Sequence, residues 1–249
     1  MNTVAIIQAR MGSTRLPGKI MKELMGHPML WHAVQRVRSA KKLNRVVVAT
    51  TTNKEDDVVE QFCKENEIPY YRGSAENVLS RYCEAAKKFN ADVVVRITAD
   101  CPLISPEIID QCVDVYFRSG CDYVSNGAPP ENRTYIRGLD VEVFSFAALC
   151  RAFEQATEAY EKEHVTPYIW ENKHGTYKIH PVLPAPPEYA KDYRLTVDYP
   201  EDFTLIEKVY AALYRKPSEV IPISEAIAFL DTYPDVAQLN AHCVQKSVK

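Results

Sequence analysis

Three apolar runs rich in β-branched residues constrain the fold of this chain more than any other feature. Residues 4–8 read VAIIQ, residues 45–50 read RVVVAT and residues 92–98 read DVVVRIT. Val and Ile follow one another without polar alternation, which is typical of strands buried on both faces. Segments with apolar residues at helical spacing accompany these runs, at 28–39, 55–66 and 77–89. The alternation predicts an α/β domain with a mostly parallel central sheet and helices on both faces.

The second half of the chain has a different pattern. Residues 139–146 read LDVEVFSF, and this alternation predicts an antiparallel or edge strand. No linker divides the chain, so we expect a single domain over residues 1–249 with an inserted arm at about 145–190. The other expected elements are short strands at 68–71, 123–125 and 193–197, an alternating segment at 176–183, a helix between Ser105 and Gly120, and helices at 147–156, 162–172, 200–214 and 223–230.

The composition argues against several classes of protein. The chain has 30 Lys and Arg residues against 33 Asp and Glu residues, so it lacks the basic excess of a general nucleic-acid-binding protein. It has no run of about 18 apolar residues, which a membrane-spanning helix needs, so we expect no membrane partner. No signal peptide is recognisable, and the seven cysteines include no Cys-x-x-Cys pair. We therefore expect reduced thiols in a cytoplasmic protein.

The loop after the first apolar run is rich in groups that bind phosphate. It reads ARMGSTRLPGK over residues 9–19. Its glycines let backbone N–H groups approach phosphate oxygens, its hydroxyl groups donate hydrogen bonds, and Arg10, Arg15 and Lys19 supply positive charge. In open parallel sheets, ligands bind at the carboxyl ends of strands, where this loop lies. We predict that it binds a nucleoside triphosphate, the alternative being a solvated loop with ordinary surface charges.

Neither common phosphate-binding fingerprint fits this loop. Five residues separate Gly12 from Gly18, where a Walker loop has four, and Ile20 stands in place of the hydroxyl residue that would hold Mg²⁺. A metal ion therefore needs other ligands. Asp100 and Asp198 each follow a short apolar run, in TADCPLI and LTVDYPEDF, and two carboxylates at strand ends suit Mg²⁺. Alternatively, Asp100 is a turn residue and Asp198 is the N-cap of the next helix.

Three motifs, in this order and spacing, resemble those of a known enzyme family. QARMGSTRLPGK, TADCPLI and VDYPEDF look like motifs of the cytidylyltransferases that make CMP-activated acidic sugars, such as CMP-KDO and CMP-sialic acid synthetases. The resemblance covers about residues 3–210 and is greatest to the branch typified by spore coat polysaccharide biosynthesis protein F. It implies a Rossmann-like nucleotide-diphospho-sugar transferase fold and a homodimer in which the 145–190 arm reaches the partner's site. It also implies Mg²⁺ as cofactor, CTP and a sugar acid as substrates, and a role in surface polysaccharide biosynthesis.

The resemblance assigns roles to individual residues. A hydroxyl of the acceptor attacks the α-phosphorus of CTP, and pyrophosphate leaves. Asp100 and Asp198 match the magnesium ligands, and Lys19, Arg15 and Asp100 are the residues expected to be catalytic. The residues that match nucleotide contacts are Ala9, Arg10, Gly12, Ser13, Arg15, Lys19, Arg72, Asn77 and Arg81.

The acceptor is less closely defined by these motifs. Residues 98–102 read TADCP, where the CMP-KDO enzymes have Gln-Gly-Asp-Glu-Pro, so the chain departs from the KDO pattern. An acidic acceptor needs a cation, and Arg133, Arg137 and Lys162 are candidates, the alternative for each being a solvated side chain. His164 is expected to line the substrate pocket, the alternative being a surface or capping histidine. Two other functions are open at this point. One is a glycosyltransferase, although its usual Asp-x-Asp is missing, and the other is a non-catalytic nucleotide-binding homologue.

Overall fold

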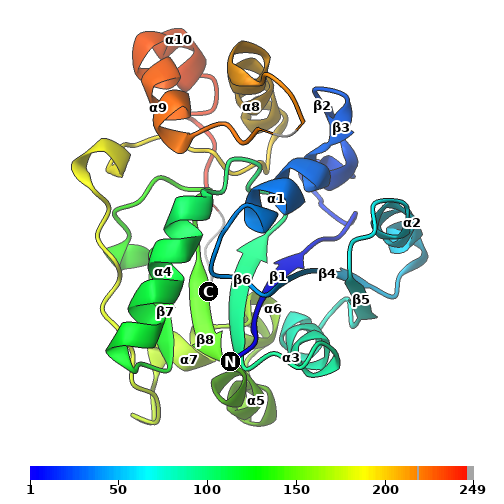
Figure 1. The fold of residues 1–249 in the computed structure, drawn as a ribbon, viewed down its shortest axis with the longest axis vertical. Coiled ribbons are helices and arrows are strands. Elements are labelled where there is room, and N and C mark those ends of the chain that lie inside the picture. Colours follow the sequence, from blue (N-terminus) through cyan, green and yellow to red (C-terminus); the bar gives the residue numbers. More distant parts are fainter. Residues whose placement is uncertain (218, 246–249) are drawn as a thin grey trace.

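The central sheet has six strands among the described residues of this computed structural model, which are 1–217 and 219–245. The strands are β1 (Thr3–Gln8), β4 (Arg45–Thr51), β5 (Tyr70–Gly73), β6 (Val93–Thr98), β7 (Tyr123–Ser125) and β8 (Glu142–Ser145). Their order is β5-β4-β1-β6-β8-β7, and neighbours pair in parallel except that β8 is antiparallel to both β6 and β7 (Figure 1). The predicted, mostly parallel sheet is confirmed, and the carboxyl ends of β1, β4, β5 and β6 meet at one edge.

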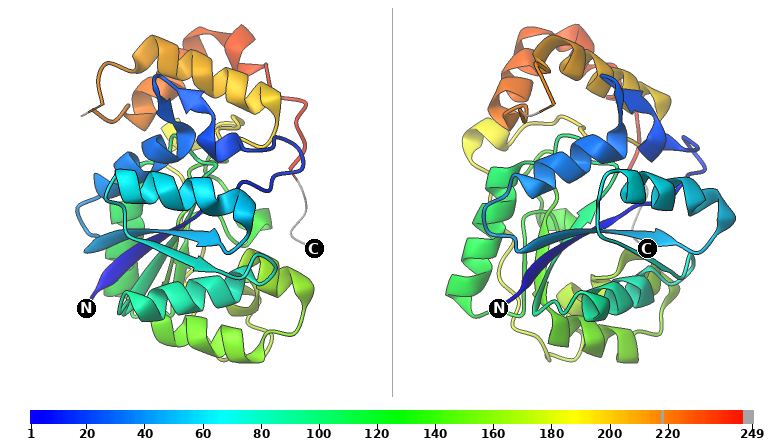
Figure 2. Two further views of the ribbon diagram at one scale, coloured as in Figure 1. Left: turned by 90° about the vertical axis from the view of Figure 1, so that its right-hand side faces the viewer. Right: turned by 45° about the vertical axis from the view of Figure 1, so that its right-hand side comes forward.

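Helices cover both faces of this sheet, as Figure 2 shows. The side chains of β1 alternate: Ala5 and Ile7 belong to a first apolar core, and Val4 and Ile6 belong to a second one on the opposite face. The first core contains residues of α1 (Met29–Arg38), α2 (Asp57–Glu65) and α4 (Pro106–Ser119), and the second contains residues of α3 (Val78–Lys88), α5 (Phe146–Gln155) and α7 (Pro167–Glu171). Each helix packs its apolar face on the sheet, as predicted from the helical spacing.

The remaining helices gather beyond one edge of the sheet, next to α1 (Figure 1). They are α8 (Pro200–Leu213), α9 (Ile223–Thr232) and α10 (Pro234–Ala237), and they extend the first core. A small hairpin of β2 (Glu23–Leu24) and β3 (His27–Pro28) was not expected from the sequence. None of the helices described here combines the length and the apolar character that crossing a membrane requires.

Local sequence signals predicted some element boundaries well and others poorly. The Ser105 side chain accepts a hydrogen bond from the N–H of Ile108, and Gly120 ends α4 with a φ of 60°, so both ends of this helix are confirmed. In contrast, 176–183 and 193–197 are not strands: among the described residues they form only the isolated bridges Tyr123–Ile179 and Arg137–Arg194. β8 is antiparallel as predicted, but it lies inside the sheet and not at its edge.

The segment 145–190, predicted as an inserted arm, packs onto the domain in this chain. α5 and α6 (Ala159–His164) both contact α3, and α7 contacts α5 and α6. Leu149, Ala152, Val165 and Ile169 are buried in the second core. An apolar helix face packs on the nearest apolar surface, and α3 supplies one. The inserted arm itself stays an expectation. The homodimer contact expected of this segment stays a prediction.

His32 should make folding stability dependent on pH. This α1 residue is 3% exposed, its Nε2 lies 2.6 Å from the carbonyl oxygen of Leu24, and its ring packs on Tyr210. Burial lowers the pKa of His32 to about 4, so the folded state binds fewer protons than the unfolded state between the ordinary pKa of 6.5 and pH 4. Stability therefore falls as the pH drops through this window. We expect this group to account for about 2–3 kcal/mol of lost unfolding free energy between pH 7 and 4.5.

Denaturant unfolding at the two pH values tests this expectation. The wild-type protein and the exposed-site control His174→Gln should lose the same free energy on acidification, and His32→Gln should lose about 2–3 kcal/mol less. Equal losses in all three proteins would show that His32 is not the group responsible.

Candidate active site

A cavity of about 750 Å³ opens at the carboxyl ends of β1 and β6, where the sequence placed the ligand site. The loop after β1 forms one wall, and residues of α3, α6 and α7 contribute to another. Residues from the loop before β8, from the turn before α8 and from segment 240–245 complete the lining. The volume lies within the range of pockets that enclose a small-molecule ligand.

The loop after β1 is held in shape by its own backbone and by a buried aspartate. The N–H of Met11 donates to Oδ1 of Asp56 at 2.6 Å, and the N–H of Gly18 donates to the carbonyl of Met11 at 3.1 Å. Asp56 is fully buried, and its other oxygen accepts a hydrogen bond from the Thr51 hydroxyl. Gly18 has a φ of 69°, which favours glycine and turns the chain so that Lys19 enters the cavity. No sequence motif singles out Asp56.

Lys19 connects the two aspartates that were predicted as metal ligands. Its Nζ lies 2.8 Å from Oδ2 of Asp100, 2.9 Å from Oδ1 of Asp198 and 2.7 Å from the carbonyl oxygen of Val197. Burial alone would lower the pKa of Lys19, but the two carboxylates outweigh it and raise the pKa. Burial alone would raise the pKa of Asp100, but the Lys19 ammonium outweighs it and lowers the pKa to about 2. Lys19 and Asp100 are therefore both charged at neutral pH.

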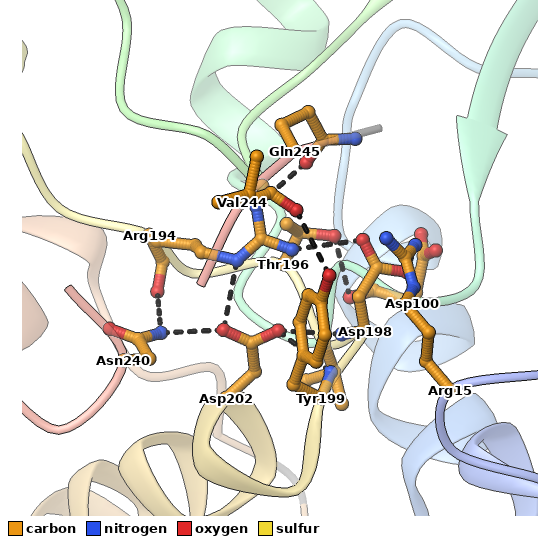
Figure 3. A network of polar contacts seen from close by, with 12 residues as sticks. Arg15, Asp100, Arg194, Thr196, Asp198, Tyr199, Asp202, Asn240, Val244 and Gln245 are labelled. Carbon is orange, nitrogen blue, oxygen red and sulfur yellow. Dashed lines mark hydrogen bonds and ion pairs between the residues drawn. The ribbon is translucent and has the colours of Figure 1, made fainter. Parts of the chain in front are cut away.

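Arg15 contacts the same aspartate from the loop side. One of its Nη atoms lies 2.8 Å from Oδ1 of Asp198, and its guanidinium lies over the ring of Tyr199 at 4.9 Å from the centroid (Figure 3). Burial opposes the charge of Arg15, but hydrogen bonding to Tyr199 and the charge of Asp198 raise its pKa. Arg15 and Lys19 thus present two permanent positive charges at one corner of the cavity.

The structure brings most of the predicted site residues together. The cavity is lined by Ala9, Arg10, Gly12, Ser13, Arg15, Lys19, Arg81, Asp100, Arg137, His164 and Asp198. Arg81 is 1% exposed, and one of its Nη atoms donates to the carbonyl of Ser74. Burial lowers the pKa of Arg81, and the nearby charge of Arg10 lowers it further, so an anionic ligand would relieve the repulsion between them.

Two predicted nucleotide contacts lie outside the cavity lining. Arg72 donates to the carbonyls of Thr51 and Asn53 and pairs with Asp57 and Glu60 of α2 at 2.7 and 2.5 Å. Arg72 is therefore paired with the acidic face of α2 and does not line the cavity, and its contact with the nucleotide stays a prediction.

Asn77 is the second such residue. It is the N-cap of α3, and its Oδ1 accepts a hydrogen bond from the N–H of Ser80 at 2.9 Å. This local bond gives Asn77 a structural role, and its contact with the nucleotide stays a prediction.

The sequence reasoning did not predict two ion pairs in the cavity lining. Arg96 of β6 pairs with Glu142 of β8, and Glu142 also accepts a hydrogen bond from the hydroxyl of Tyr123 at 2.7 Å. Arg133, which had been a candidate acceptor contact, pairs with Asp140. Arg96 and Glu142 face one another in the antiparallel register, but no sequence motif predicts that pairing.

The donor chemistry of the two aspartates fits a hard divalent cation. Asp100 and Asp198 each direct a carboxylate oxygen at the same ammonium group, so the two side chains converge at the edge of the cavity beside the phosphate-binding loop. Few carboxylate ligands, with phosphate oxygens and water completing the shell, are the usual environment of Mg²⁺ in nucleotide sites. A bound cation would take the place of the Lys19 ammonium next to at least one of these carboxylates.

Comparisons with known proteins agree on one family. A family model described as Cytidylyltransferase matches residues 4–241. The spore coat polysaccharide biosynthesis protein SpsF of Bacillus subtilis is 36% identical over 242 residues, which cover 93% of this chain and 95% of that protein. A 3-deoxy-manno-octulosonate cytidylyltransferase of Trichlorobacter lovleyi is 36% identical over 116 residues, or 47% of this chain and 45% of that enzyme. The solved structure of a cytidylyltransferase from Leptospira borgpetersenii superposes with a TM-score of 0.85 at 34% identity, covering 96% of this chain and 97% of that one.

Proposed function

This chain belongs to the cytidylyltransferase family, and on that premise we propose that it transfers CMP from CTP to an acidic sugar, with release of pyrophosphate, for surface polysaccharide biosynthesis. The observation that carries the proposal is the convergence of Lys19, Asp100 and Asp198 beside the loop after β1. That arrangement combines a triphosphate site with a metal site at the edge of one large cavity. The similarity of the chain to a 3-deoxy-manno-octulosonate cytidylyltransferase supports a sugar acid as the acceptor class.

The proposed reaction forms one P–O bond and breaks another. An acceptor hydroxyl oxygen attacks the α-phosphorus and loses its proton, and the bond from that phosphorus to the bridging oxygen breaks. The electron pair of the broken bond leaves with pyrophosphate. Such a transfer needs positioning and neutralisation of charge more than covalent help from the protein. We name no residue as general base.

The residues of this chain supply both requirements. Arg15 and Lys19 remain charged and lie next to the loop backbone, so they stabilise the negative charge that grows on the leaving pyrophosphate. Asp100 and Asp198 would hold Mg²⁺, which, when bound, supplies further charge neutralisation at phosphate oxygens. Arg81 and Arg10 add positive charge on the α3 side of the cavity.

The acceptor end of the cavity is proposed to include Arg137 and His164, with Arg133 nearby. Burial lowers the pKa of Arg137, and the charge of Arg133 lowers it further. An acceptor carboxylate placed here would compensate this local excess of positive charge. His164 lines the same cavity from the end of α6.

The path of a phosphorus label tests the proposal directly. CTP labelled at the α-phosphorus is incubated with Mg²⁺ and a mixture of KDO, sialic acid and pseudaminic acid. The proposal predicts that the label enters a sugar product in equal amount to the pyrophosphate released. Transfer of a sugar from a CMP-sugar to a second acceptor would indicate a glycosyltransferase instead, and binding of CTP without any labelled product would indicate a non-catalytic role.

We also propose a cytoplasmic homodimer in which the 145–190 segment meets the partner. Support comes from the seven cysteines, all of which are free, and from Phe153 of α5, whose ring is 41% exposed on this segment. Light scattering on the full-length protein tests the dimer, and a monomer at micromolar concentration would contradict it.

A further inference from the structure

The two oxygens of the Asp198 carboxylate face different partners. Oδ1 contacts Lys19 at 2.9 Å and Arg15 at 2.8 Å, on the side of the cavity. Oδ2 contacts an Nη atom of Arg194 at 2.9 Å (Figure 3). A carboxylate with each oxygen bound to a different cation cannot rotate freely. The orientation in which Asp198 meets a ligand is therefore set partly by Arg194.

Arg194 is itself fixed by a buried network. Its Nε donates to Oδ1 of Asp202 at 2.9 Å, and its other Nη donates to Oε1 of Gln245 at 2.7 Å. Asn240 is 1% exposed, and its Nδ2 donates both to the carbonyl of Arg194 at 2.9 Å and to Oδ1 of Asp202 at 2.8 Å. Burial alone would lower the pKa of Arg194, but its bonds with Asp202 and Asp198 outweigh it, so the guanidinium stays charged.

Asp202 connects this network to the backbone that carries Asp198. Its Oδ2 accepts hydrogen bonds from the N–H groups of Asp198 at 2.8 Å and Tyr199 at 2.9 Å. Asp202 is fully buried and lies in the first turn of α8. The same carboxylate therefore holds both the main chain of Asp198 and the guanidinium that holds its side chain.

Residues 240–245 reach this place from a distant part of the sequence. Gln245 binds Arg194, and the carbonyl of Val244 accepts a hydrogen bond from the hydroxyl of Tyr199 at 3.3 Å. Val244 and Gln245 also line the cavity. Figure 1 shows the chain leaving α10 and running back toward the sheet. One side of segment 240–245 thus contacts Arg194 and Asp202, and the other side lines the cavity.

We propose that Arg194 is a positioning residue for Asp198 and that segment 240–245, through Asn240 and Gln245, holds Arg194 in the required place. The proposal rests on the proposed function, since it assumes that Asp198 is a metal ligand. Partners that orient a ligating carboxylate commonly change metal affinity or activity by about 10–100-fold when they are lost. A network that served folding alone would change the melting temperature and leave metal affinity untouched.

The experiment measures Mn²⁺ binding to the full-length protein with CTP present, by electron paramagnetic resonance of the free ion. Arg194→Lys keeps the charge but has one nitrogen in place of the three that reach Asp202, Gln245 and Asp198, and we expect the Mn²⁺ dissociation constant to rise about 10–100-fold. Asn240→Ala and the exposed-site variant Gln245→Ala are expected to raise it about threefold to tenfold. The matched control is His242→Ala, on the same segment, whose imidazole lies 3.9 Å from Glu201 and does not touch Arg194; its constant should stay within about twofold.

The outcomes separate this inference from the proposed function. The inference alone would be overturned if the wild-type protein forms CMP-sugar and the folded variants bind Mn²⁺ as tightly as His242→Ala does. A lowered melting temperature with unchanged Mn²⁺ affinity would likewise assign the network to folding. Wild-type protein that binds no Mn²⁺ with CTP and forms no product would overturn the proposed function, and the inference with it.

Discussion

Lys19→Met is expected to lower the rate of pyrophosphate release by about a thousandfold while the protein stays folded. The Lys19 ammonium is the one group seen to bind Asp100, Asp198 and the carbonyl of Val197 together among the described residues. Methionine fills nearly the same volume but cannot neutralise charge on the triphosphate. It also leaves two carboxylates facing one another, so the pKa of Asp100 should rise from about 2 toward its ordinary value.

A variant of a neighbouring lysine is the control, and the steady-state kinetics of the two variants are compared. Lys22 lies three residues further along and packs over the ring of Phe203, at 4.9 Å from its centroid, without lining the cavity. Lys22→Met should therefore retain activity within about threefold. If Lys19→Met kept more than about a tenth of wild-type kcat, Lys19 would not be the main cation at the triphosphate.

Asp100→Asn is expected to lower metal-dependent turnover by about a thousandfold, which corresponds to a loss of several kcal/mol of transition-state stabilisation. The amide keeps the shape of the side chain but loses the charge that attracts a cation. Lys19 retains its contacts with Asp198 and Val197, so the fold should survive. Asp110→Asn is a matched control, because Asp110 accepts hydrogen bonds from the N–H groups of residues 41 and 42 outside the cavity.

The pKa of Asp100 gives this prediction a pH signature. Its folded pKa of about 2 lies below the ordinary 3.8, so its contribution to stability is present above pH 3.8 and is lost as the pH falls toward 2. Asp100 should therefore add no inflection to the wild-type rate profile between pH 5 and 8. Near-normal turnover of Asp100→Asn with Mg²⁺ would contradict its role as a metal ligand.

The sequence predicted those parts of the site that depend on a continuous motif at the end of a strand. The loop 9–19 and Asp100 follow β1 and β6, and parallel pairing brings the ends of these strands to one edge of the sheet. Strand order alone is therefore enough to predict that the loop and Asp100 lie together. Asp198 follows an apolar run that is not a strand, and the hydrogen bond from the N–H of Val197 to the carbonyl of Asp100 at 2.8 Å brings it to the same place. Arg81, which the family resemblance had suggested, also lines the cavity.

The residues that were misplaced or missed depend on contacts between distant segments. Arg72 is drawn to Asp57 and Glu60 because α2 packs beside β5, which the sequence pattern of either element does not reveal. Arg194 and Asn240 are 46 residues apart and meet in irregular structure, where no periodicity exists to be recognised.

The second half of the chain shows the same limit. The alternating segment 176–183 runs beside β7, where the N–H groups of His180 and Leu183 donate to the carbonyls of Tyr123 and Ser125 at 3.0 and 2.9 Å. Alternation reports that one side of a segment is buried, but it does not identify the neighbouring segment. The single helix expected at 162–172 is divided into α6 and α7, and the packing of α5 and α6 on α3 followed only from the structure.

The central claim is that this chain makes a CMP-activated sugar acid, and pyrophosphate release across substrates tests it most directly. Each of the four nucleoside triphosphates is combined with Mg²⁺ and with KDO, sialic, pseudaminic or legionaminic acid, or a neutral sugar. The account predicts release with CTP and an acidic acceptor, and none with a neutral sugar. The account would be contradicted if pyrophosphate release required a different triphosphate or a neutral acceptor. It would also be contradicted if folded protein that binds CTP released no pyrophosphate with any pair of substrates.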